Sequence, residues 1–207
     1  MTQALQSIKK PLAKLGRILP WLLIIGGIIG IIASLVITSE KFALAANPNH
    51  QTMCDLNPII SCGSVMKSDQ ASAFGFPNTY IGLVGFPIVV TTGVAMLAGA
   101  RFKRWWWLGM QAGLTFGVVF AYWLLWQSMY RIHALCPWCL SVDVAISAVF
   151  WYVTLYNFYQ GHLTLPARLK PLGRFVKKHH VDILLFGLIA VAAIILQHFW
   201  YYFGANL

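Results

Sequence analysis

The stretch HALCPWCLSVDVAISAVFWYVTLYNFY, residues 133–159, joins two features that seldom share one segment. Cys136 and Cys139 stand three positions apart, a spacing typical of thiol–disulfide exchange or of a metal site. From Leu140 to Tyr159 the chain is predominantly apolar, with Asp143 as its one acid, and a run of this length predicts a membrane-spanning helix. The stretch therefore predicts a cysteine pair at the boundary of a membrane.

The composition of the whole chain agrees with a membrane protein. Of its 207 residues 59% are hydrophobic and only 10% are charged, whereas soluble domains have about 25% charged residues. A water-soluble fold of this composition would expose too much apolar surface, and we exclude it. Five runs are long and apolar enough to predict spans: Pro20–Thr38, Tyr80–Gly99, Trp105–Tyr130, Leu140–Tyr159 and Ile183–Phe203. We therefore expect an all-α integral membrane protein.

The positive charges are sorted by loop. The net charge is +10, and twelve of the fifteen Lys and Arg residues lie before the first span, between the second and third, or between the fourth and fifth. They are Lys9, Lys10, Lys14, Arg17, Arg101, Lys103, Arg104, Arg168, Lys170, Arg174, Lys177 and Lys178. The positive-inside rule then puts the N-terminus in the cytoplasm and the C-terminus outside. This sorting accounts for the charge without a nucleic-acid partner.

The first span has two interpretations. A basic start, an apolar run and the segment FALAAN at residues 42–47 resemble a cleavable signal peptide. The apolar run Pro20–Thr38 is longer than the usual length of about 7–15 residues for such a segment. It also contains Gly26-x-x-x-Gly30, a motif for close packing of membrane helices. We favour a retained helix, and cleavage would leave the sidedness of the later loops unchanged.

All four cysteines fall in loops that the charge pattern places outside. Cys54 and Cys62 lie between the first two spans, and Cys136 and Cys139 lie between the third and fourth. Disulfides form and persist on this oxidising side. The sequence alone leaves open whether the cysteines form redox pairs, inert bridges or a metal site.

Local signals predict how the cysteines are held. Asn57-Pro58 favours a turn between the first two cysteines. The segment SVMKSDQASAF, residues 64–74, predicts an amphipathic helix on the membrane surface. Pro137 is tolerated in a first helical turn, so the fourth span is expected to begin at the Cys-x-x-Cys motif. The helix macrodipole would there lower the pKa of the nearer thiol.

The four cysteines are compatible with three kinds of site. Zinc is disfavoured because the seven residues between Cys54 and Cys62 exceed the usual gap of about two to four. Two inert disulfides remain an alternative, although a bridge across Cys-x-x-Cys closes a tiny loop and would stabilise little. A redox relay is favoured, because a pair at the membrane boundary can exchange with thiols in water and with a lipid-soluble quinone. Cys136, Cys139 and Asp143 would share one helical face.

With both pairs placed, the sequence resembles the vitamin K epoxide reductase family, in its bacterial disulfide-generating branch. The matching pieces are CDLNPIISCG at residues 54–63, Ser68, FPNTYIG at residues 76–82 and LCPWC at residues 135–139. The resemblance covers roughly residues 20–160. It implies a four-helix transmembrane bundle around a quinone, menaquinone or ubiquinone, with a long extracytoplasmic loop between helices 1 and 2. The fifth helix would be an addition.

The charge pattern and the resemblance together imply a division of the chain and a place in the cell. The expected parts are a basic cytoplasmic N-terminus (1–19), a redox bundle (20–160) that includes the loop 39–79, a basic cytoplasmic loop (161–180), and a fifth helix with a short outer C-terminus (181–207). The expected location is the inner membrane of a bacterium. Because no fused thioredoxin-like domain is recognisable, the resemblance implies a separate soluble thioredoxin-like partner on the outer side.

The resemblance implies a role for each cysteine. Cys136 and Cys139 would lie next to the quinone, with Cys139 facing the ring. Cys62 would exchange with Cys136, and Cys54 would meet the outside partner. The implied activity is a thiol:quinone oxidoreductase that generates disulfides for exported proteins. The alternatives are a quinone or quinone-epoxide reductase that uses the same cysteines, and a non-catalytic scaffold with structural disulfides.

Three further residues are candidates for the quinone site. Ser68 and Asn78 match positions that the family places near the quinone oxygens or the loop cysteines, and each could equally be a helix cap. Asp143 departs from the family, which often has an aromatic or apolar residue there. It would act as a proton relay, or simply complement the positive start of its helix.

Overall fold

The computed structural model describes residues 2–163, 173, 175–176 and 178–204, and these are helical apart from loops. The elements are α1 (Thr2–Ala46), α2 (Cys62–Lys67), the 3-10 helix η1 (Asp69–Ser72), α3 (Thr79–Leu97), α4 (Arg104–Gln127), the π-helix η2 (Ser128–Ile132), α5 (Pro137–Tyr159), α7 (His180–His198) and α8 (Trp200–Phe203). Among the described residues five helices are long and apolar enough to cross a membrane. The predicted all-α fold of a multi-pass membrane protein is confirmed.

Helix α1 extends beyond the predicted span in both directions. It has 45 residues, which is about 68 Å at 1.5 Å per residue. The helix continues past Thr38 because polar side chains of its last turns have partners. The Glu40 carboxylate lies 3.0 Å from Nε2 of His50, and the Lys41 ammonium donates to Oγ of Ser72 at 2.6 Å. The first loop therefore begins near Asn47 and is shorter than the predicted 39–79.

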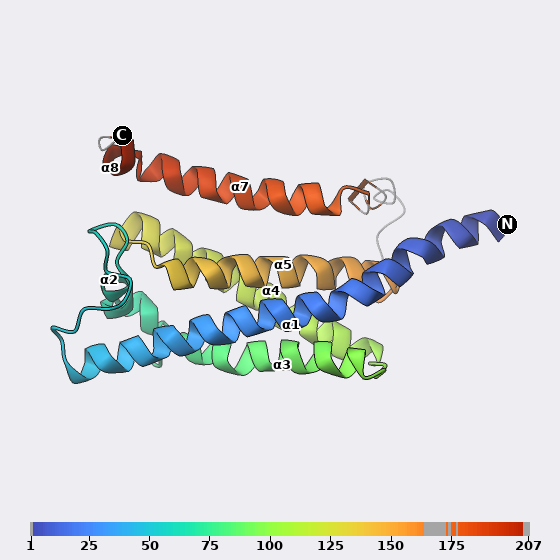
Figure 1. The fold of residues 1–207 in the computed structure, drawn as a ribbon, viewed down its shortest axis with the longest axis horizontal. Coiled ribbons are helices and arrows are strands. Elements are labelled where there is room, and N and C mark those ends of the chain that lie inside the picture. The colour runs from blue at the N-terminus through green and yellow to red at the C-terminus, as the bar shows by residue number, and fades with distance from the viewer. Residues whose placement is uncertain (1, 164–172, 174, 177, 205–207) are drawn as a thin grey trace.

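Close packing of α1 against α3 and α5 builds the bundle, and α4 packs on α5 (Figure 1). A Cβ at Gly26 would lie 2.7 Å from Cγ2 of Val149 in α5, and one at Gly27 would lie 2.5 Å from Cγ2 of Val90 in α3. Gly30 likewise faces the ring of Phe86. The predicted close-packing role of this glycine motif is confirmed.

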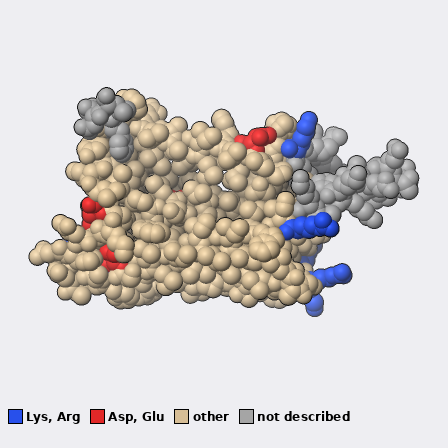
Figure 2. Space-filling model, viewed as in Figure 1, with Lys and Arg blue, Asp and Glu red and all other residues tan. Residues whose placement is uncertain are grey.

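The bundle has two chemically different ends. The four cysteines lie at one end, which we call the cysteine end. The turn between α3 and α4 carries Arg101 and Lys103, and α4 begins with Arg104, at the opposite end, where Figure 2 shows Lys and Arg gathered. We call this the basic end. Of the other basic residues predicted for that side, the side chains of Lys9, Lys10, Lys14, Arg168, Lys170, Arg174 and Lys177 lie outside the described part of the chain.

Candidate redox site

The inner pair, Cys136 and Cys139, occupies the first turn of α5. Pro137 stands at the start of this helix, so the helix begins at the motif as predicted. Cys136 is the N-cap, and its Sγ accepts a hydrogen bond from the Cys139 N–H at 3.4 Å. Both residues are free thiols.

The start of α5 also favours the ionised form of one thiol. Cys136 precedes the span, and a hydrogen bond from the Cys139 thiol lowers its pKa, helped by the N–H groups of Cys139 and Trp138 and opposed by burial. A lowered pKa raises the thiolate fraction, which disulfide exchange requires. Cys136 is therefore suited to act as a nucleophile.

The outer pair, Cys54 and Cys62, forms a disulfide with a Cα–Cα distance of 5.6 Å. The chain between them turns at Asn57, whose Oδ1 accepts hydrogen bonds from the N–H groups of Ile59 at 3.0 Å and Ile60 at 2.7 Å. The turn predicted at Asn57-Pro58 is thus present. It returns the chain towards the first cysteine, which lets the two sulfurs meet.

Asp55 ties the disulfide loop together. Its carboxylate accepts hydrogen bonds from the Thr52 N–H at 2.9 Å, the Ser61 hydroxyl at 2.8 Å and the Gly63 N–H at 3.0 Å. Partial burial alone would raise the pKa of Asp55, but these hydrogen bonds outweigh it and lower the pKa to about 2. The group is therefore ionised at neutral pH and joins the two ends of the loop.

A short backbone bridge aligns the two cysteine pairs. The Ser61 N–H donates to the Leu135 carbonyl at 3.1 Å, and the Leu135 N–H donates to the Ile59 carbonyl at 2.6 Å. The bridge pairs Ile60 with Leu135 in the parallel sense, so Cys62 and Cys136, which follow two and one residues later, lie side by side. Their Sγ atoms are 3.2 Å apart, in contact but not bonded, since a disulfide measures about 2.05 Å.

Apolar side chains enclose the sulfurs. Cys54, Cys62 and Cys136 have exposed fractions of 7%, 0% and 1%, and they form one buried cluster. The other buried members of that cluster are Ile37, Leu44 and Met66. Water is therefore largely kept from the sulfurs that face each other.

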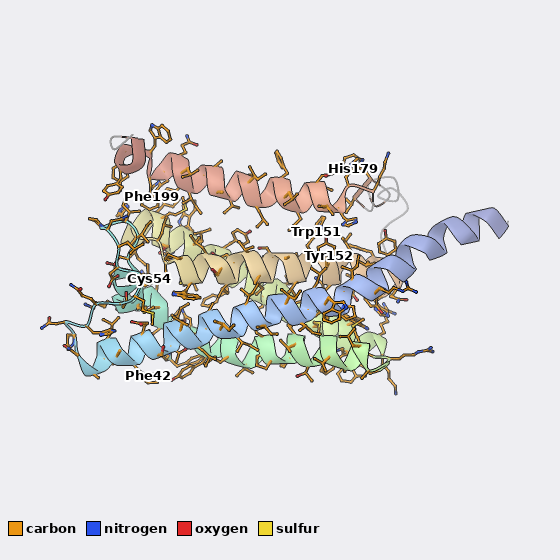
Figure 3. All side chains as sticks on the ribbon, in the orientation of Figure 1. Phe42, Cys54, Trp151, Tyr152, His179 and Phe199 are labelled. Carbon is orange, nitrogen blue, oxygen red and sulfur yellow. A yellow bond between two sulfur atoms is a disulfide. The ribbon has the colours of Figure 1, made fainter. Side chains whose placement is uncertain are left out.

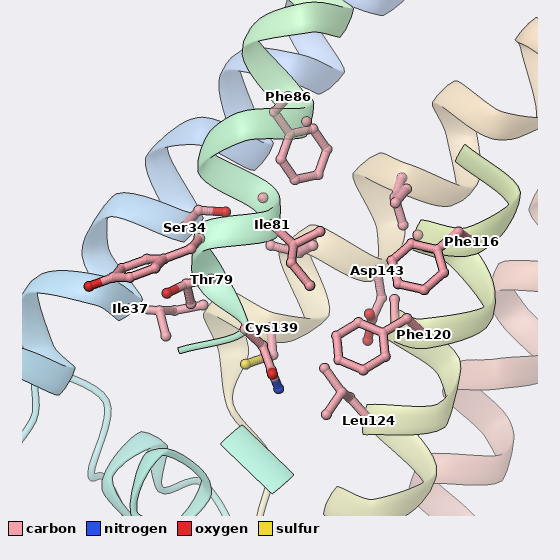
Figure 4. A pocket seen from close by; sticks show the side chains of 18 of the residues that line it. Ser34, Ile37, Thr79, Ile81, Phe86, Phe116, Phe120, Leu124, Cys139 and Asp143 are labelled. Atoms are coloured by element: carbon pink, nitrogen blue, oxygen red, sulfur yellow. The ribbon is translucent and has the colours of Figure 1, made fainter. Parts of the chain in front are cut away.

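A cavity of about 830 Å³ opens beneath the inner pair, between α1, α3, α4 and α5. Figure 4 shows Cys139 and Asp143 of α5 facing Phe116, Phe120 and Leu124 of α4 across this space. Its volume lies within the range of about 300–1,000 Å³ that is typical of small-molecule sites. Most of the lining is apolar. The polar side chains in the lining include Ser34, Lys41, Ser68, Gln70, Asn78, Thr79, Ser128 and Asp143.

Ser68 and Asn78 both line the cavity, and neither makes a side-chain hydrogen bond to the start of the helix that follows it. The Ser68 hydroxyl donates to the Val65 carbonyl at 2.7 Å. The Asn78 Nδ2 donates to the Gln70 carbonyl at 2.6 Å, and its Oδ1 accepts from the Ala73 N–H at 3.0 Å. The bonds of Asn78 hold the η1 turn at the rim of the cavity, and the bond of Ser68 closes the end of α2.

The single surface helix predicted over residues 64–74 is wrong. Helix α2 ends at Lys67, Ser68 is extended with ψ of 150°, and η1 follows. The Ser68 hydroxyl bonds locally to the backbone, which competes with continuing the helix. Helix α2 also buries Cys62 and Met66, so one of its faces packs against the protein.

Asp143 lies on α5 beyond the inner pair, and its carboxylate points into the cavity (Figure 4). Within the described part of the chain no hydrogen bond or ion pair to this carboxylate is found. Asp143 is the seventh residue of the helix Pro137–Tyr159, and the attraction of an acid to a helix start falls off within the first turn. Simple complementation of the helix start therefore explains Asp143 poorly.

Two polar residues of the site were missed in the sequence. Asp55 follows Cys54 directly in a turn-rich loop, a position where an acid often bonds to nearby N–H groups, and this signal would have found it. Lys41 lines the cavity rim and donates to the Ala71 carbonyl at 3.1 Å. Nothing in the local sequence indicates this contact, because it joins the end of α1 to η1.

The bonding of the cysteines bears on the metal alternative. A zinc site of all four sulfurs is incompatible with the Cys54–Cys62 disulfide. Among the residues whose placement is described, no group of three or more His, Cys, Asp or Glu side chains is arranged to hold a metal ion.

Comparison with known protein families gives a match. The sequence profile of the vitamin K epoxide reductase family matches residues 21–154, which include both cysteine pairs and the cavity. No relative among curated proteins matches the chain. Members of the matching family are membrane oxidoreductases that work through cysteine redox chemistry and use quinones.

Proposed function

We propose, since the chain belongs to the vitamin K epoxide reductase family, that this membrane thiol oxidoreductase passes electrons from a soluble thioredoxin-like partner through its two cysteine pairs to a quinone. The net result is the generation of disulfides for exported proteins. The observation that carries the proposal is the contact of 3.2 Å between Sγ of Cys62 and Sγ of Cys136, at the top of an apolar cavity that Cys139 also lines.

The first exchange takes place at the outer pair. A thiolate of the partner attacks Sγ of Cys54, a bond between the partner and Cys54 forms, and Cys62 leaves as a thiolate. The second thiolate of the partner then displaces Cys54, and the partner departs with its own disulfide. Because Cys54 is largely buried, the loop around Thr52–Leu56 has to move aside for this step.

The second exchange joins the two pairs. The Cys62 thiolate attacks Sγ of Cys136 in an inner disulfide, the Cys62–Cys136 bond forms, and Cys139 leaves as a thiolate. Cys54 then attacks Cys62, which restores the outer disulfide and releases Cys136. The bonding in the structure corresponds to the end of this step, with Cys54 and Cys62 joined and the inner pair as thiols.

The residues of the cavity fit a quinone. The space is apolar, large enough for a ring with part of a chain, and has few polar groups, as expected for a site of this kind. A bound quinone supplies an acceptor for two electrons and two protons. We assign the electron donor to Cys139, the proton-holding group to Asp143, and the groups that bind ring oxygens to Ser68 and Asn78. The apolar walls would keep water from the reacting atoms.

The orientation in the membrane is part of the proposal. The basic end would face the cytoplasm of a bacterial cell, in keeping with the positive-inside rule, and the cysteine end would face outward. The gathering of Arg101, Lys103 and Arg104 at the end opposite the cysteines supports this orientation. We retain the division into a redox bundle, residues 20–160, and a fifth helix within 181–207 as a proposal.

The proposal is tested with purified protein in lipid nanodiscs, using reduced thioredoxin or dithiothreitol as donor and ubiquinone or menaquinone as acceptor. We expect Cys136→Ser and Cys139→Ser to lose quinone reduction with either donor. Cys54→Ser and Cys62→Ser should lose only the thioredoxin-driven reaction, because the small thiol can reach the inner pair directly. Full activity in all four variants would exclude the relay.

The same preparation separates the alternatives. Vitamin K epoxide offered in place of the quinone tests the quinone-epoxide reductase, which would convert it at a rate comparable with that of quinone reduction. An inert scaffold would keep both pairs unlabelled by an alkylating reagent after mild dithiothreitol treatment. The proposed relay predicts rapid labelling of the inner pair.

A further inference from the structure

The helix α7 lies on the outside of the bundle and is tied to it at both ends. None of its residues, all of which are described, is buried. At the basic end the Trp151 Nε1–H donates to the His180 carbonyl at 2.8 Å. At the cysteine end the residue after the helix, Phe199, has an exposed fraction of 0%. Figure 3 shows Phe199 at the same end of the molecule as Cys54.

Phe199 supports the bridge that aligns the cysteine pairs. Its ring belongs to a buried cluster with Ile59 and Leu135, completed by Leu125 and Met129. The backbone of Ile59 accepts the hydrogen bond of the Leu135 N–H, and these residues lie three and one positions before Cys62 and Cys136. The residue that follows the fifth helix thus adds an aromatic ring to the cluster that includes a residue from each segment presenting a reacting sulfur.

His198 makes a second contact with the same region. Its Nε2 lies 2.9 Å from the Met129 carbonyl oxygen. Because a carbonyl can only accept, the Nε2–H of His198 donates this hydrogen bond. Met129 belongs to the π-helix η2, which leads into the bridge through His133 in a left-handed conformation with φ of 57°. The ring of Tyr130 packs on His198 with centroids 4.6 Å apart. His198 therefore anchors the segment that precedes Cys136.

We propose that Phe199 and His198 are positioning residues for the exchange between the two cysteine pairs. The inference rests on the proposed function and concerns the step in which the Cys62–Cys136 bond forms, the Cys136–Cys139 bond breaks and Cys139 leaves as a thiolate. Without the Phe199 ring, the space under the bridge allows Ile59 and Leu135 to shift. The sulfurs then lose the alignment that holds them in contact, and small misplacements slow a reaction strongly.

The direct test measures formation of the Cys62–Cys136 bond in the full chain carrying Cys54→Ser and Cys139→Ser, in nanodiscs. Diamide is the oxidant, and the linked peptides are quantified by mass spectrometry over time. Phe199→Ala should slow linkage by at least about tenfold. The control is Phe186→Ala, a change of the same residue type on α7 at a side chain with an exposed fraction of 75%, and linkage should be unchanged. Equal rates in the two variants would overturn the inference.

A second readout separates positioning from general damage. In the protein with all four cysteines, Phe199→Ala should lose the thioredoxin-driven reduction of quinone but keep the dithiothreitol-driven rate within about twofold, because the small thiol bypasses the outer pair. An equal fall in both rates would show a merely structural role. His198→Gln, which retains an N–H donor, should preserve thioredoxin-driven activity better than His198→Leu, and the reverse order would contradict the role of His198.

Failure of the proposed function gives a different result. If the unchanged protein reduces no quinone with either donor, the relay to quinone is wrong. The linkage assay does not need a quinone, so Phe199→Ala and Phe186→Ala still differ there if Phe199 positions the pairs.

Discussion

Glycines serve opposite purposes on the two sides of the bundle. On the side where α1 meets α3, a Cβ at Gly93 would lie 2.7 Å from the Pro20 carbonyl oxygen, so the glycine allows two helices to touch. On α4, a Cβ at Gly109 or Gly113 would meet no atom within 4 Å, and both positions line the cavity. Glycine in a membrane helix can therefore mark either close contact or space for a ligand.

The largest effect on folding is expected where α1 packs against α3. Gly93→Leu forces a side chain against the backbone of α1, which cannot move aside as a flexible side chain would. Overpacking of this kind typically costs about 1–3 kcal/mol. We expect a clear fall in the thermal midpoint and in the yield of folded protein. Gly85→Leu, on the same helix but at a position lining the cavity, is the matched control and should fold. An equal fall in the thermal midpoint and yield of both variants would show that the packed and cavity-lining glycines do not differ.

At the cavity, where the α4 glycines have no neighbour, we expect a substitution to reduce activity and to leave folding unchanged. Gly113→Leu fills part of the cavity without displacing a neighbour. Quinone reduction should fall by about tenfold, equivalent to about 1.4 kcal/mol, while the thermal midpoint stays the same. Gly16→Leu, which is also free of neighbours within 4 Å but lies outside the cavity, should leave the rate unchanged. An unaffected rate in Gly113→Leu would place the quinone elsewhere.

This contrast shows what the sequence can and cannot predict. The spans follow from apolar run length alone, and Pro137 correctly indicates where α5 begins. The Gly26-x-x-x-Gly30 motif predicts a packed face because its spacing matches that of touching helices. Gly109 and Gly113 have the same spacing, and only the separation of α3 from α4 in the fold leaves them facing a cavity.

In the candidate site too, local features are predicted from the sequence and long-range contacts are not. The cysteine pairs and the turn at Asn57 are local features, and the sequence therefore predicts them. The contact of Cys62 with Cys136 depends on a bridge between segments 74 residues apart, and the chain pattern alone does not specify it. The support from Phe199 comes from a helix that carries no buried residue of its own, and so no periodic pattern indicates it.

A substitution of the acid in the cavity tests the role assigned to Asp143. Asp143→Asn keeps the size of the side chain but removes the group assigned to hold a proton. Loss of such a group typically costs a factor of about 10²–10⁴, and we expect a loss of quinone reduction towards the lower end of this range. Linkage of Cys62 to Cys136 by diamide should proceed as before, because that step does not use the cavity. Undiminished quinone reduction would leave Asp143 without the assigned role.

The smallest effect is expected in the loop that covers the cysteine end. The pKa of Asp55 is about 2 in the folded loop, below its ordinary value of 3.8. Its hydrogen bonds therefore stabilise the fold fully above pH 3.8, and this contribution is lost as the pH falls through about 2. Between these values the thermal midpoint of the unchanged protein should fall more than that of Asp55→Asn. Parallel pH curves would exclude this contribution.

The most direct test of the account uses the Cys139→Ser variant, isolated from membranes under acid quench and analysed by mass spectrometry without reduction. Cys136 can then attack the outer disulfide at Cys62 and release Cys54 as a thiol. Cys139 is absent and cannot resolve the new bond from the inner side, so the bond is reversed only by the return attack of Cys54 on Cys62, which the acid quench stops. The account predicts a peptide pair joined through Cys62 and Cys136, with Cys54 as a free thiol. Recovery of only the Cys54–Cys62 bond, with Cys136 always unlinked, would contradict an exchange between the two pairs.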